Sequence, residues 1–193
     1  MTTGKSIVLG FRELRKFCNQ LSLLLRTADG LMGEAGWIPI PRSTVVGSGS
    51  GGIEFPDWWL PADFSRFYRH DSQRHLLTYV AAIVNDHPND PGGVVVTESL
   101  ISSGWFDYGV GNESKPWEYK FCRAHIWWGD QLDYGTLRFS DNPQLIGLPA
   151  YVLKSGALAC LIDDVLSPAA LREKVIQPLL DDIGHRITGV VAE

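Results

Sequence analysis

Apolar residues in the first part of the chain recur at alternating spacings of three and four. They are Phe11, Leu14, Cys18, Leu21, Leu25, Ala28, Met32 and Ala35. Such positions share one face of a helix, and Gly36 follows as a stop signal. We therefore predict an amphipathic helix over residues 11–35. Leu23, Leu24 and Leu31 widen the apolar face, which favours packing on a sheet of the same chain over a two-chain coiled coil, although a homodimer stays open.

Two segments in the middle of the chain have the apolar pattern of strands covered on both faces. Residues 76–84 are apolar at nearly every position, and residues 94–103 contain three successive valines. A third segment, residues 119–139, alternates apolar and polar side chains on both sides of a Gly/Asp turn, which predicts two antiparallel strands. Together they predict a sheet within residues 76–162.

The predicted hairpin gathers four suggestive side chains. Because every second residue of a strand shares a face, Arg123, His125 and Trp127 of its first strand and Arg138 of its second lie on one surface. Tryptophan and arginine dominate binding energy at protein interfaces. We expect this surface to contact a partner.

The connection over residues 104–117 is long and rich in glycine and aromatic residues. Connections of this length inside a compact domain are often functional. Trp105, Tyr108 and Trp117 are therefore candidate contact residues.

Two further segments invite a ligand-binding interpretation. Residues 43–52 form a Gly/Ser loop that formally matches GxGxxG, but the following Ile53-Glu54-Phe55-Pro56 cannot open the helix that a phosphate site needs. Arg66 and Arg69, three residues apart, are candidates for holding an anionic ligand. The alternative is a short amphipathic helix in which Phe64 and Phe67 or Tyr68 pack inward and the arginines face water.

The last third of the chain predicts two short strands and a helix. The strands cover residues 150–153 and 157–162, on either side of a Lys-Ser-Gly turn. Ser167 is a suitable helix cap and Pro168 a suitable first residue, so the helix spans residues 168–183. Pro178 should bend it, because proline removes one backbone hydrogen bond.

Composition narrows the function classes. The 193 residues suffice for one domain with its own core, and the net charge of −5 disfavours sequence-independent nucleic-acid binding. The apolar patch near the start, Ile7 to Leu9, is too short for a membrane span. Three widely spaced cysteines without a CxxC pair indicate neither disulfides nor a zinc site. We therefore expect a reducing compartment and a cytoplasmic location. We expect no membrane partner, metal or cofactor.

Two pairs of residues have side chains of the types used in catalysis. Cys122 and His125 resemble a thiol and its base, but their odd spacing sends them to opposite faces of the predicted strand. Glu98 falls within the valine-rich strand, where it must face water or be paired, and Arg123 or His125 are the candidate partners. A structural ion pair is one interpretation, and an acid/base enzyme using Glu98 and His125 is another.

The sequence therefore predicts a single α+β domain over residues 1–193, with a mainly antiparallel sheet covered by a long N-terminal helix and a C-terminal helix. The favoured function is a non-catalytic protein-binding module of adaptor, immunity or regulatory type. A sensor domain for a small anionic ligand, held by Arg66, Arg69 or Arg123, is the alternative.

Overall fold

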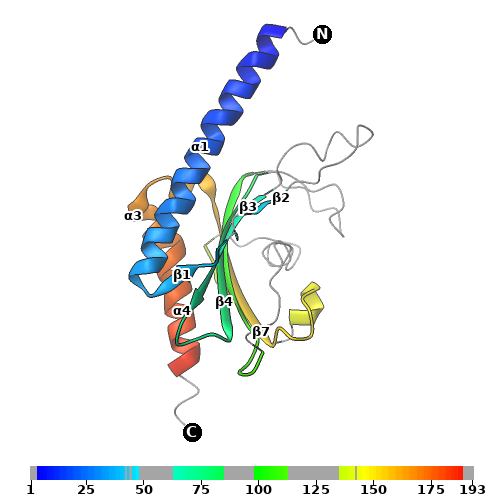
Figure 1. Cartoon of the computed structure of the whole chain (residues 1–193), viewed down its shortest axis with the longest axis vertical. Coiled ribbons are helices and arrows are strands. Elements are labelled where there is room, and N and C mark those ends of the chain that lie inside the picture. The colour runs from blue at the N-terminus through cyan, green and yellow to red at the C-terminus, as the bar shows by residue number, and fades with distance from the viewer. Residues whose placement is uncertain are drawn as a thin grey trace.

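The computed structural model describes residues 4–41, 43, 45–47, 63–84, 98–112, 135–141 and 143–188. Over these ranges the chain forms one antiparallel sheet of seven strands with helices against one side, as Figure 1 shows. The predicted α+β class is thus confirmed, as are the antiparallel sheet and the two flanking helices. The segments 48–62, 85–97 and 113–134 lie outside the described residues.

The elements follow the chain in a simple order. They are α1 (Gly4–Glu34), β1 (Trp37–Pro39), β2 (Val45–Gly47), β3 (Asp63–His70), β4 (Leu76–Ile83), β5 (Leu100–Asp107), β6 (Arg138–Ser140), the 3-10 turn η2 (Pro143–Ile146), β7 (Lys154–Leu161), the 3-10 turn η3 (Ile162–Val165), α3 (Pro168–Leu171), the π-helical turn η4 (Arg172–Ile176) and α4 (Gln177–Thr188). The strand order is β1-β3-β4-β5-β7-β6, and β2 also pairs with β3. As predicted for residues 76–84, β4 is central and buried at every position.

The prediction of a short helix around Phe64 is wrong, because this segment is strand β3. It pairs with β4 along its length, with Phe67 opposite Tyr79 and Arg66 opposite Val80. Phe67 and Tyr68 are both buried, but on opposite faces of the sheet. Pairing with an apolar central strand outweighs the weak helical pattern of the isolated segment.

Strand β5 also lies further along the chain than predicted. It runs from Leu100 to Asp107, so Gly104 and Trp105 belong to a central strand and not to a connection. The predicted strand ended at Ser103, because Gly104 is typical of the start of a connection. Gly104 is required by close packing, since a Cβ there would lie 2.5 Å from the Gly156 carbonyl oxygen and 2.8 Å from the Tyr79 ring.

Strand β7 replaces the two short strands predicted around a Lys-Ser-Gly turn. These three residues begin the strand, and residues 150–153 form a turn and an extended link before it. Gly156 is accommodated inside the strand because the Trp105 indole lies against its backbone; a Cβ at Gly156 would lie 2.5 Å from Nε1 of Trp105. Glycine here serves packing rather than chain reversal.

The sheet separates two buried clusters. On the helix side, residues of α1, α3, η4 and α4 pack on Val80, Ile101 and Leu158. On the other side, Phe67, Tyr79 and Phe106 form a second cluster with Leu148 and Val152. Figure 1 shows α1, α3 and α4 gathered on one face.

The terminal helices follow the predicted patterns with different limits. Helix α1 begins at Gly4, seven residues before the predicted start, and ends before Gly36, whose φ of 81° suits glycine. The Ser167 side chain accepts a hydrogen bond from the Ala170 amide, as expected of a cap. Next to Pro178, the helix forms a π turn in which the Gln177 amide donates to the Arg172 carbonyl.

Candidate functional site: the projecting half of helix α1

Helix α1 has two halves with different surroundings. Its buried residues are Leu21, Leu24, Leu25, Ala28, Leu31 and Met32, all in the second half. Residues 4–20, which we call the projecting segment, contain no buried residue. The N-terminal end of this segment reaches beyond the sheet, as Figure 1 shows, whereas Phe17 packs against the helix-side core. All of residues 4–13 are exposed.

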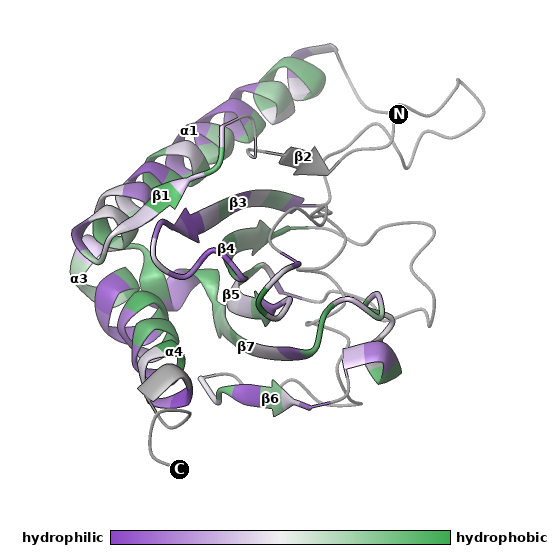
Figure 2. Cartoon of the chain, turned by 60° about the horizontal axis from the view of Figure 1, so that its bottom comes forward, coloured by the Kyte–Doolittle hydropathy of each residue, from purple (hydrophilic) through white to green (hydrophobic). Residues whose placement is uncertain are grey.

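The apolar face that packs on the sheet continues into the projecting segment. Ile7, Phe11, Leu14 and Cys18 extend the 3-4 spacing that leads to Leu21 and the buried half. Ile7 is 50% exposed and Phe11 is 66% exposed, whereas Leu14 and Cys18 are half-buried. Figure 2 shows hydrophobic residues along the whole of α1, including its far end. Large apolar side chains in a continuous row on a surface typically mark an interaction site.

The sequence also explains why residues 4–13 stay helical although all of them are exposed. An isolated helix of this length would be marginal because its first turn is costly to form. Here the packed half supplies that turn, and the projecting segment only extends it. Lys16 and Glu13 form an exposed ion pair at 2.8 Å, which adds slightly to the stability of the helix.

The projecting segment is basic in a chain that is acidic overall. Lys5, Arg12, Arg15 and Lys16 outnumber the single acid Glu13, so the segment carries a net charge of +3 against −5 for the whole chain. The charged side chains lie mainly on the face opposite to the row of Ile7, Phe11, Leu14 and Cys18. The apolar row is therefore open to an apolar partner surface.

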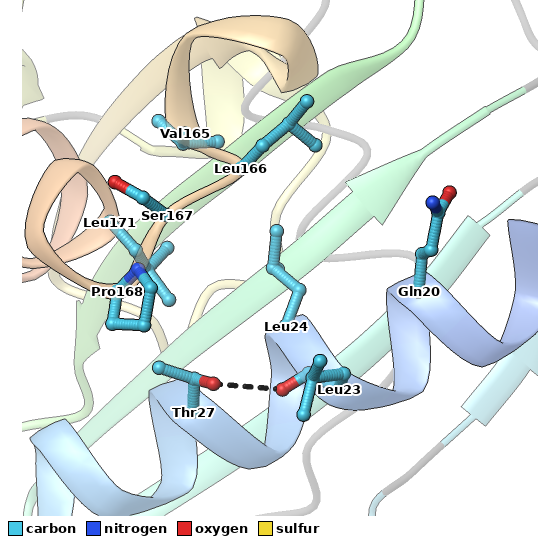
Figure 3. A pocket seen from close by; sticks show the side chains of 9 residues that line it. All are labelled: Gln20, Leu23, Leu24, Thr27, Val165, Leu166, Ser167, Pro168 and Leu171. Carbon is cyan, nitrogen blue, oxygen red and sulfur yellow. Dashed lines mark hydrogen bonds between the residues drawn. The ribbon is translucent and has the colours of Figure 1, made fainter.

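A shallow apolar groove lies beside the packed half of α1. Its volume is about 330 Å³, and Leu24 and Thr27 of α1 face Val165, Pro168 and Leu171 across it, as Figure 3 shows. Leu23 and Leu166 on its rim are exposed. The groove is on a different face of α1 from the apolar row.

The two arginines predicted to hold an anion do not share a face. On strand β3 a spacing of three sends Arg66 to the helix side and Arg69 to the other side. The Arg66 guanidinium donates to both carboxylate oxygens of Asp29 on α1, at 3.0 and 3.1 Å. This pair ties α1 to the sheet. Burial raises the pKa of the neighbouring Tyr68, and the negative charge of Asp29 raises it further.

Trp105 is buried instead of exposed on a loop. Its side chain is on the helix side of β5, its residue is 3% exposed, and its Nε1 donates to Oδ2 of Asp182 at 2.6 Å. Arg186 donates to the other oxygen of Asp182 and lies over the ring of Phe139, which packs beside Trp105. The cluster joins α4 to the sheet.

The other candidate residues are scattered. Tyr108 is 1% exposed and packs edge-on against Tyr151 on the far side of the sheet. Arg138 begins the edge strand β6 and is partly exposed. Trp117, Arg123, His125 and Trp127 lie outside the described residues, so their shared surface stays a prediction.

The candidate acid/base pair is not assembled by the described residues. Glu98 is exposed in the bend before β5, which corrects its predicted place within a strand. Its proposed partner His125 is outside the described ranges. Within those ranges, no group of three potential metal ligands occurs and no helix is long and apolar enough to cross a bilayer.

The sequence contains a signal for the projecting segment that lies outside the predicted helix of residues 11–35. Ile7 precedes Phe11 by four residues and so belongs to the same row, but the predicted helix began at Phe11. Comparisons with protein-family models, curated proteins and solved structures found no match.

Proposed function

We propose that this chain is a non-catalytic protein-binding module of adaptor or regulatory type, and that the projecting segment of α1 supplies its main contact surface. The observation that carries the proposal is the continuous apolar row of Ile7, Phe11, Leu14 and Cys18 on a helix beyond the sheet. Leaving such a row in water forfeits the stabilisation that burial provides, which is on the order of 2 kcal/mol for a large side chain.

The mode of recognition follows from the helix itself. Amphipathic helices bind partners by placing anchors at spacings of three and four in an apolar groove or against another helix. Phe11 is the aromatic anchor of the row, and its large exposed area makes it the residue whose loss should matter most.

A pull-down with the tagged full-length chain tests the proposal. The bait is used as wild type, as Phe11→Glu and as Leu145→Glu, a control that changes an exposed leucine on η2. The prey are a cell extract and a differently tagged copy of the same chain, with bound proteins identified by mass spectrometry. Proteins retained by wild type and Leu145→Glu, but lost from Phe11→Glu at an unchanged melting temperature, support the proposal. Equal retention by all three baits contradicts it.

A small-ligand sensor is the second candidate, because of buried hydroxyls on the sheet face opposite the helices. Ser65 and Ser155 are buried on β3 and β7, and among the described residues their Oγ atoms have no hydrogen-bond partner. Buried hydroxyls are costly when unpaired, and a ligand bound at either one would satisfy it. The two serines are three strands apart and four residues out of register, so one small ligand does not reach both. Arg69 belongs to the same face. A thermal-shift screen of nucleotides and carboxylate metabolites tests this candidate, since a ligand should raise the melting temperature of wild type but less that of Ser65→Ala.

A further inference from the structure

We draw no further inference here: the strongest candidate, the shallow apolar groove between the packed half of α1 and the residues that lead into α3, carries no proposal because nothing in the structure shows what covers it.

Discussion

The burial of Trp105 allows a quantitative test of how the C-terminal helix is held. Replacing a buried tryptophan by alanine typically costs about 3–5 kcal/mol in unfolding free energy. Trp105 is 3% exposed, lies beside Phe139 and donates to Asp182, so we expect Trp105→Ala to fall at the upper end of that range. Domains of this size are stable by about 5–15 kcal/mol, so the variant should be severely weakened.

The hydrogen bond can be separated from the ring. Trp105→Phe keeps an aromatic ring but removes the N–H group that donates to Asp182, and a hydrogen bond to a charged group contributes about 1.5–3 kcal/mol. A double-mutant cycle with Asp182→Ala should therefore show a coupling energy of similar size. Asp182 retains its bond from Arg186 in the single variant, so its carboxylate is not left unpaired.

Urea denaturation followed by far-ultraviolet circular dichroism measures these differences, provided that the slope with denaturant is unchanged. A loss below about 1 kcal/mol for Trp105→Ala would refute the burial argument, because no tryptophan packed between a helix and a sheet is that dispensable. The ring would then belong on the surface, where the sequence had suggested a contact residue.

Three further predictions concern α1 and its neighbours. Gly30 is exposed in the helix with open space for a Cβ, so Gly30→Ala should raise the unfolding free energy by about 0.5–1 kcal/mol in urea denaturation. Gly36 has a positive φ and lies against the His70 ring, so Gly36→Ala should lower the unfolding free energy by about 1–2 kcal/mol. Burial and the Asp29 charge raise the pKa of Tyr68, so the folded protein keeps the phenol proton to higher pH than the unfolded chain. The contribution of this protonated phenol to stability is full below about pH 10 and is lost as pH rises further. Tyr68→Phe should therefore lose less stability at alkaline pH than wild type. Arg66→Ala and Asp29→Ala should be coupled by about 1 kcal/mol in a double-mutant cycle, and additive losses would contradict a direct pair.

Long periodic segments were predictable from sequence because their pattern and their environment agree. The 3-4 spacing of α1 and of the C-terminal helix, the Ser167 cap and the all-apolar β4 each correspond to one unambiguous physical solution. The start of α1 was missed because residues 4–10 include two glycines and gain their helical state by extension from the packed half.

Strands β3, β5 and β7 were misassigned, at least in part, because their residues are specified by neighbours far along the chain. Gly104 and Gly156 are normally signals for a turn, and here they make room for the Tyr79 and Trp105 rings. Similarly, Arg66 seemed free for a ligand because its partner Asp29 is 37 residues away. No local pattern reports such contacts. The predicted roles of Arg66 and Trp105 as binding residues therefore differ most from what the structure shows.

The contact between the Trp105 indole and the Gly156 backbone also has a consequence for how this sequence can vary. A side chain at position 156 would occupy the space that the Trp105 indole fills. Position 156 can therefore gain a side chain only when position 105 holds a smaller ring or none. Gly156→Ala should therefore be harmful alone and nearly silent in a chain that already carries Trp105→Ala. Divergent versions of this protein should exchange volume between the two positions as one unit.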